Sequence, residues 1–445
     1  MKMIAEFVLI RAFVIQCSNL DYQLLQSSLT DLGMFNVLVV ITVLLITLQS
    51  GYLFGWWPIV GNEQAQLVQS GEQGEEKGRN DITTKTIEKN KAKEAGSARA
   101  VLQTDDNTIE NLAVILNKKL SDFPSEKGGP TKKLCDRAKS ASEPCVNATC
   151  PTMFSSSPEI RLKQILSTRN ESLHSFKSAM AEVTRGVSAS FKYMLVSAVS
   201  ANHYYEMQAM VKNVHTHLLP RLTNFTFIIF DLGLTPLQRN LTEKNCGCTV
   251  LDYPFDKLPA LFSILKCYTW KPMIIRSLIE KTEFLVWMDS SVRWNRTAQS
   301  LDSLFQRCRE RGLQVWFGRI GSVAVHTEHD MFRFYGDQPC QYDPYGEMHG
   351  SYGVYHNEPF VRYAVLDPWL SCAFTRRCMC LQNAKHSCAR KTLPRRTGVC
   401  HRFDQSSLGI ILIKLYGSRI KLINMNTQME VHRGDNAKWF GRLAG

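Results

Sequence analysis

The segment FLVWMDSSVRW, residues 284–294, combines an apolar run with an acid and two hydroxyls near its end. The run predicts a buried strand, and Asp289 stands at its carboxyl end. Open α/β sheets bind ligands outside the carboxyl ends of their strands, so we expect Asp289 to take part in ligand binding. Asp also favours strand ends and turns for purely local reasons, and this alternative stays open.

Alternating strands and helices from about residue 190 place Asp289 in a sheet. The alternation favours an α/β fold with a mostly parallel sheet, flanked by helices and joined by right-handed crossovers. The carboxyl ends of such strands meet at one edge, which would bring Asp231 towards Asp289. The section after residue 320 is rich in Tyr and His, and we expect helix or loop there. The predicted strands are 191–201, 225–233, 248–255, 284–289 and 314–320, and the predicted helices are 109–120, 202–219, 271–282, 300–312 and 406–417.

The N-terminal part predicts a membrane anchor. No residue from Leu32 to Asn62 is charged, and the stretch 34–60 is mostly large and apolar. A run of this length can cross the hydrocarbon core of a bilayer, about 30 Å thick, as one helix. The polar stretch that follows, up to about residue 130, cannot bury a firm core. We therefore expect a cytoplasmic tail at 1–33, an uncleaved anchor at 34–60, a stem at 61–189 and a folded lumenal domain at 190–445.

Glycosylation acceptor sites and cysteines favour the secretory pathway for the folded domain. Five Asn-x-Ser/Thr sites and thirteen of the fourteen cysteines follow the apolar run. This cysteine density favours disulfides over zinc, because no Cys-x-x-Cys pair occurs. An odd number leaves one cysteine free or available for a disulfide-linked dimer. We expect a single-pass type II membrane protein, glycosylated at Asn147, Asn170, Asn224, Asn240 and Asn295.

Four segments of the second half carry a resemblance when taken together: YMLVSAVSANHYYE, FIIFDLGLTPLQ, YTWKPMIIRSLIEKTEFLVWMDSSVRW and HRFDQSSLGIIL. They resemble a family of animal type II membrane proteins that is known only as a domain of unknown function. That family is related to the nucleotide-diphospho-sugar transferases of the GT-A fold. The resemblance spans 190–435 and implies a Rossmann-type, GT-A-like domain, a nucleotide-sugar donor and a Golgi location.

More distantly, WMDSSV resembles the DxD loop of glycogenin-like glycosyltransferases, and VHRGDNAKWF, residues 431–440, resembles their carboxyl-terminal segment. The resemblance implies that Asp289 and His432 hold a divalent cation such as Mn²⁺ against the leaving diphosphate. Ser291 replaces the second acid of the loop and is a weaker ligand for a hard cation. Neutralisation of the diphosphate by lysine and arginine, with Arg293 close in sequence, is therefore the alternative.

The resemblance also assigns side chains to the donor and the acceptor. Lys271 and Lys438 would add positive charge near the phosphates, and Asp231 would contact the ribose or the base. Asp404 and Gln405 correspond to a pair that contacts the acceptor or donor sugar, and either could assist as a base. Asp404 is also well suited to cap the helix that follows it.

The segment from Pro368 to Phe403 contains eight Lys or Arg residues, two His and no acid, in a chain with a net charge of +13. Such a segment could face the diphosphate or an acidic glycan, although solvated basic loops are common. No nucleic-acid-binding motif is recognisable, so we expect no nucleic acid partner. Two functions fit: a glycosyltransferase that moves a sugar from a nucleotide donor to a glycan or glycoprotein, and a non-catalytic binding protein that keeps the fold.

Overall fold

The computed structural model describes residues 109–121, 133–140, 142–150, 153–168, 173–295, 300–382, 384–388, 395–425 and 429–440. These residues belong to one compact unit, Thr84–Gly445. The predicted tail (1–33), the predicted anchor (34–60) and Asn170 lie outside the described residues. No helix within the described ranges is both long enough and apolar enough to span a membrane.

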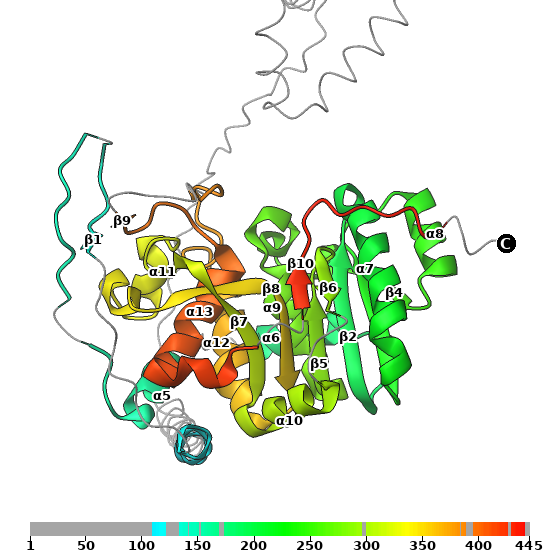
Figure 1. The fold of residues 1–445 in the computed structure, drawn as a ribbon, viewed down its shortest axis with the longest axis horizontal. Coiled ribbons are helices and arrows are strands. Elements are labelled where there is room, and N and C mark those ends of the chain that lie inside the picture. The colour runs from blue at the N-terminus through cyan, green and yellow to red at the C-terminus, as the bar shows by residue number, and fades with distance from the viewer. Residues whose placement is uncertain are drawn as a thin grey trace, which may run out of the picture. The chain divides into compact units, whose positions relative to one another are not determined.

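A six-stranded sheet with the order β4-β3-β2-β5-β8-β7 forms the centre of this unit (Figure 1). β2, β3, β4 and β5 pair in parallel, whereas β8 runs antiparallel to both of its neighbours. The predicted α/β fold with a mostly parallel sheet is therefore confirmed. The strands are β2 (Phe191–Val199), β3 (Phe225–Asp231), β4 (Thr249–Asp252), β5 (Thr282–Met288), β7 (Leu313–Ser322) and β8 (Gly346–His356).

Two hydrophobic clusters cover the two faces of the sheet. Side chains alternate along β5, so that Leu285 and Trp287 join one cluster while Val286 and Met288 join the other. Burial on both faces explains why these strands read as continuous apolar runs in the sequence. The first cluster contains residues of α9 (Trp270–Leu278), α12 (Asp367–Phe374) and α13 (Phe403–Tyr416), and the second contains residues of α7 (Tyr204–His217) and α10 (Leu301–Arg311).

Segments before residue 190 also contribute to the core. The predicted helix at 109–120 forms and buries Leu112 and Leu116 in the first cluster. Leu162 of α5 (Pro158–Leu166) and Phe176 of α6 (Leu173–Val183) join the same cluster. The packed core therefore includes residues that the sequence analysis assigned to the stem. The remaining elements are α8 (Pro236–Asn245), α11 (His329–Phe334), β1 (Leu134–Cys135), β6 (Val292–Trp294), β9 (Arg395–Arg396) and β10 (Met429–Val431).

The expectation of helix or loop after residue 320 was wrong for β8. This strand contains three glycines, at 346, 350 and 353, which weaken any strand signal in the sequence. Hydrogen bonding to β5 on one side and β7 on the other stabilises it instead. The consequence for the site is direct, because β8 places backbone and side chains next to the carboxyl end of β5.

Six disulfides account for twelve of the cysteines, as the cysteine density predicted. The thirteenth, Cys308, is free and fully buried, and its thiol donates to the carbonyl oxygen of Val354. No accessible thiol for a disulfide-linked dimer is therefore present among the described residues. The pairs are Cys135–Cys145, Cys150–Cys340, Cys246–Cys248, Cys267–Cys380, Cys372–Cys378 and Cys388–Cys400.

Candidate functional site

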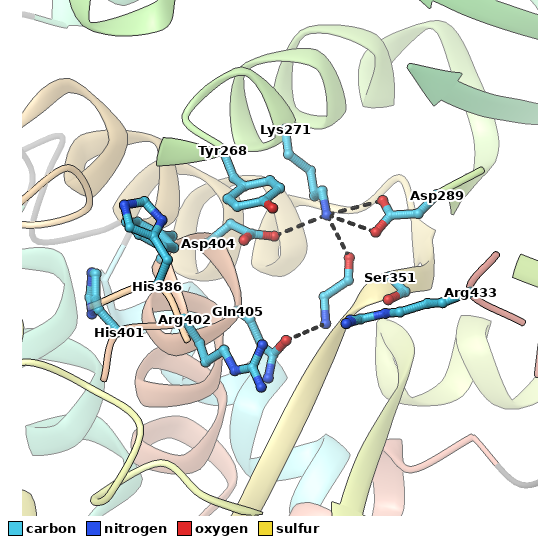
Figure 2. Close-up of a pocket in the computed structure, with 12 residues that line it drawn as sticks. Tyr268, Lys271, Asp289, Ser351, His386, His401, Arg402, Asp404, Gln405 and Arg433 are labelled. Atoms are coloured by element: carbon cyan, nitrogen blue, oxygen red, sulfur yellow. Dashed lines mark hydrogen bonds and ion pairs between the residues drawn. The ribbon is translucent and has the colours of Figure 1, made fainter. Parts of the chain in front are cut away.

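A polar cleft opens at the carboxyl end of β5, where the sequence predicted a ligand site. Its walls come from the start of α9, the middle of β8, the start of α13 and the segment after β10 (Figure 2). These elements lie far apart in the sequence and meet only in the fold. The lining residues are Tyr268, Lys271, Asp289, Gly350, Ser351, His386, His401, Arg402, Phe403, Asp404, Gln405 and Arg433.

Lys271 lies at the centre of this cleft, with its ammonium group between two carboxylates (Figure 2). Its Nζ is 3.0 Å from Asp289 Oδ1 and 3.1 Å from Asp404 Oδ2. It also donates to the carbonyl oxygen of Gly350 at 2.9 Å. The ammonium group thus has two carboxylate partners and one backbone carbonyl partner, which matches its three N–H donors in number.

The surroundings of Lys271 keep it charged. The side chain is 3% exposed, and the rings of Tyr268, Trp270 and Trp287 lie within 5.7 Å of Nζ. Burial alone would lower the pKa of Lys271, but the charges of Asp289 and Asp404 outweigh it and raise this pKa above its usual value. For Asp404 the effect of burial is larger than the opposing effect of the Lys271 charge, and the pKa of Asp404 is raised.

Asp289 is held from behind and open towards the cleft. The indole Nε1 of Trp287 donates to Asp289 Oδ1 at 2.9 Å, and the backbone N–H of Asp289 donates to the carbonyl oxygen of Ser351. Its side chain is 29% exposed, compared with 7% for Asp404. Asp289 is therefore the carboxylate that a bound ligand can reach, while Asp404 serves to fix the ammonium group.

Unusual backbone conformations border the cleft. Tyr268 and Phe403 have positive φ angles of 56° and 44°, a region that non-glycine residues rarely adopt, and their ring centroids are 5.8 Å apart. Such strain persists only where the surroundings enforce it, and it is common at functional sites. Gly350 is needed for a different reason, since a Cβ there would lie 2.8 Å from Asp404 Oδ2.

A hydrogen-bonded network joins β8 to the start of α13. Gln405 donates to Glu347 Oε1 through Nε2, and its Oε1 accepts from the backbone N–H of Gly350 at 3.5 Å. Glu347 also contacts His326 Nδ1 at 2.8 Å and Arg402 Nε at 3.3 Å. The network orients Gln405 and Arg402 along one wall of the cleft.

A second network fixes the segment after β10. β10 pairs with β6, and the two strands lie side by side in Figure 1. The buried Glu206 of α7 contacts one residue near each strand. Glu206 accepts from Ser290 Oγ at 2.7 Å and from the backbone N–H of Gly434 at 3.0 Å. Burial would raise the pKa of Glu206, but hydrogen bonds from His203, Ser290 and Gly434 outweigh it and lower the pKa to about 2. A charged Glu206 thus positions Arg433, the neighbour of Gly434.

The structure brings together four of the predicted site residues, namely Lys271, Asp289, Asp404 and Gln405. Asp404 is not the cap of α13, because the helix begins at Phe403. Its carboxylate pairs with Lys271 instead, and its contact with a sugar stays a prediction.

The other predicted site residues do not line this cleft. Asp231 Oδ1 accepts from the backbone N–H groups of Gly233 and Leu234, and Asp231 Oδ2 pairs with Arg239, so its carboxylate closes the turn after β3. Ser291 is buried, and its carbonyl oxygen accepts from the backbone N–H of His432.

Two basic residues predicted near the diphosphate, Arg293 and Lys438, and the predicted metal ligand His432 also have other surroundings. Arg293 is buried and binds Asp435 together with the carbonyl oxygens of Ser290 and Glu206, which is a structural contact. The imidazole of His432, 46% exposed, contacts Glu430 at 3.1 Å. Lys438 is exposed and lies outside the cleft lining.

Sequence reasoning missed Arg433, Tyr268 and Ser351. Arg433 is adjacent to the predicted His432, and no pattern in the sequence says which of the two side chains faces the cleft. The basic segment Pro368–Phe403 did contain a usable signal, since four lining residues belong to it: His386, His401, Arg402 and Phe403.

The residues present do not fit the Mn²⁺ site that the resemblance implied. The ammonium group of Lys271 already holds the oxygens of Asp289 and Asp404 that a cation would need. Among the described residues, the group of three metal-ligating side chains that the structure brings together is His326 with Cys388 and Cys400. Those two cysteines form a disulfide, so this group is not a metal site either.

No protein-family model matches the chain, and no curated protein matches it in sequence. Similar solved structures include the bifunctional glycosyltransferase WbbM, at 10% identity and a TM-score of 0.31, covering 52% of this chain and 38% of WbbM. The galactosyltransferase LgtC has 12% identity and a TM-score of 0.33, covering 54% of this chain and 87% of LgtC. Core-mannan synthase A of Aspergillus fumigatus, solved in a Mn/GDP form, has 9% identity and a TM-score of 0.29, covering 51% and 71%. With TM-scores this low, no conclusion about activity rests on these likenesses.

Proposed function

We propose that the chain is a glycosyltransferase that moves a sugar from a nucleoside-diphosphate donor to a glycan or glycoprotein. The single observation that carries this proposal is the strand-end carboxylate of Asp289. It is held by Trp287 and Lys271 and is exposed towards a cleft lined by acidic and basic side chains. A ligand site at the carboxyl ends of parallel strands is where open α/β sheets bind nucleotides. Two of the four sequence segments that carry the resemblance, YTWKPMIIRSLIEKTEFLVWMDSSVRW and HRFDQSSLGIIL, contribute residues to the lining of this cleft.

The reaction that this cleft would support has a defined balance of atoms. The bond from the anomeric carbon to the phosphate oxygen breaks, and its electron pair leaves on the diphosphate. The acceptor hydroxyl oxygen forms the new bond to the anomeric carbon, and its proton passes to a base. Asp289 suits that task among the lining carboxylates, because it is the one that a bound ligand can reach. Cationic side chains would stabilise the charge that develops on the leaving group.

The test is donor turnover by the purified full chain with a panel of nucleotide sugars, measured as release of nucleoside diphosphate. We expect Asp289→Asn to lower turnover by about a hundredfold or more, as loss of an electrostatic contact in the transition state does. Asp302→Asn, an exposed acid on α10, is the matched control and should leave turnover unchanged. Absence of turnover and of binding across the whole panel would overturn the proposal.

A non-catalytic binding protein is the second candidate, and the serine at position 291 favours it, because the DxD loop has lost one acid. This candidate predicts that the wild-type chain binds a ligand but turns over no donor. It also predicts that Asp289→Asn leaves partner binding intact. Measurable transfer by the wild-type chain would exclude it.

The cellular setting belongs to the same proposal. We infer a type II membrane protein of the Golgi with its anchor at 34–60, on the apolar run, the glycosylation sites and the disulfides. Three acceptor sites support glycosylation by their exposure: Asn147, Asn224 and Asn240. Asn295 is half-buried and donates to Glu430 at 2.8 Å.

A further inference from the structure

We propose that this site binds the donor's diphosphate without a divalent cation, and that Arg433 and Arg402 bind it beside the fixed charge of Lys271. This inference rests on the proposed function, since it assumes that a nucleoside diphosphate occupies the cleft. The observations behind it are the position of the Lys271 ammonium group and the two guanidinium groups that line the same cleft.

The ammonium group of Lys271 stands where a cation would have to bind. Its three donors face Asp289 Oδ1, Asp404 Oδ2 and the carbonyl oxygen of Gly350 at 2.9–3.1 Å. Carboxylate and carbonyl oxygens are also the ligands that Mg²⁺ and Mn²⁺ prefer. A metal ion could reach these oxygens only by displacing a buried lysine that is paired with both carboxylates, so the lysine takes its place.

The rest of a metal site is also missing. The residue two positions after Asp289 is Ser291, and its side chain is buried. The imidazole of His432, which was predicted as a second metal ligand, contacts Glu430 instead. In the described part of the chain, Asp289 therefore belongs to no group of three His, Cys, Asp or Glu side chains that could hold a metal ion.

Two guanidinium groups supply the charge that a metal would otherwise provide. Figure 2 shows Arg402 and Arg433 extending from opposite walls towards the same part of the cleft. Arg433 is exposed and makes no ion pair with any other described residue, whereas Arg402 contacts Glu347 at 3.3 Å. Guanidinium groups bind phosphate oxygens through two parallel N–H donors, which suits a diphosphate.

The carboxylates of the cleft pair with cations other than Arg433. Asp289 and Asp404 share the Lys271 ammonium, and Glu347 is divided between His326 and Arg402. Among the described lining residues, Arg433 is therefore a cation without an ion-pair partner, and its backbone is fixed by the contact of Gly434 with Glu206. An unpaired cation on a positioned segment is ready to accept an anionic ligand.

The test is calorimetric titration of the full chain with UDP and with GDP, in EDTA and again in MnCl₂. We expect one of these nucleotides to bind in EDTA with a dissociation constant within about twofold of that in Mn²⁺. Arg433→Gln should weaken this binding by about tenfold or more, as loss of a charge-assisted phosphate contact does. The matched control is Lys438→Gln, an exposed cation of the same segment outside the cleft, which should leave binding unchanged.

The outcomes separate this inference from the proposed function. Binding that requires Mn²⁺ would overturn the inference and leave the glycosyltransferase proposal standing. Equal binding by the Arg433 and Lys438 variants would overturn the role of Arg433. Absence of binding to either nucleotide in both buffers would overturn the inference and the proposed function together. Arg433 is exposed, so its variant is expected to fold, and circular dichroism checks this.

Discussion

Replacement of Lys271 by methionine removes the ammonium group and keeps an unbranched side chain in the same buried position. In the native chain the ammonium group lies 3.0 Å from Asp289 and 3.1 Å from Asp404. At an effective dielectric constant of about 20, each contact is worth roughly 5 kcal/mol of Coulomb attraction before desolvation is counted. Removal of one partner from a buried ion pair costs about 3–5 kcal/mol, because the other charge stays buried and unpaired. We expect the free energy of unfolding to fall by that amount.

Asp404 carries most of this cost, since it is almost fully buried while Asp289 can reach solvent. Asp404→Asn in the Lys271→Met background removes the unpaired charge, so most of the lost stability should return. Equilibrium urea unfolding of wild type, both single variants and the double variant measures the coupling, expected at about 2–3 kcal/mol. Lys212→Met, exposed on α7, is the control for loss of a lysine as such.

Two results would refute this reasoning. Purely additive effects of Lys271→Met and Asp404→Asn would show that the two groups do not form a coupled pair. A Lys271→Met chain as stable as Lys212→Met would show that the ammonium group is not needed between the carboxylates. Either result would also weaken the argument that this lysine stands in for a metal ion.

Three further predictions concern pH, the C-terminal segment and glycosylation. Burial lowers the pKa of His401 to about 4, and its Nδ1 accepts from the backbone N–H of Glu328 only when unprotonated. As pH falls from about 6.5 to about 4, the imidazole of His401 is protonated in the unfolded chain but not yet in the folded chain, so the free energy of unfolding should decline by up to about 3 kcal/mol. His401→Gln should flatten this decline when it is measured by urea unfolding at a series of pH values. Glu206→Gln should raise amide hydrogen exchange in residues 429–440 by about tenfold, measured by mass spectrometry, because the carboxylate that accepts from Gly434 loses its charge; unchanged exchange would contradict the role of Glu206. Asn224→Gln, at an exposed acceptor site, should remove one glycan and increase the mobility in gel electrophoresis of chain expressed in animal cells, and no change would argue against glycosylation there.

The sheet could be predicted from the sequence because its strands are buried on both faces. β2, β3 and β5 appear as uninterrupted apolar runs, and Asp289 marks the end of β5 without ambiguity. β8 could not be predicted, since its glycines and histidines have little strand propensity and only its neighbours make it a strand.

The site could be predicted only in part, for a different physical reason. Residue type and position at a strand end identified Asp289, and the resemblance assigned Asp404 and Gln405, but the partner of a charge is decided by the tertiary fold. Lys271 at a helix start has the sequence features of a solvated lysine, and only α13 and β8 make it a buried bridge between carboxylates. The tertiary fold also explains why His432 was predicted in place of Arg433, because the pairing of β10 with β6 decides which of the two side chains reaches the cleft.

The Cys267–Cys380 disulfide has a practical consequence for producing the protein. It covalently joins the residue before Tyr268 to the basic segment that contains His386, His401 and Arg402. Chain made in a reducing bacterial cytoplasm would lack this link, and the two walls of the cleft would then be held by non-covalent contacts alone. Material for any assay of the site should therefore come from a host with an oxidising export route, and a thiol count should accompany each preparation.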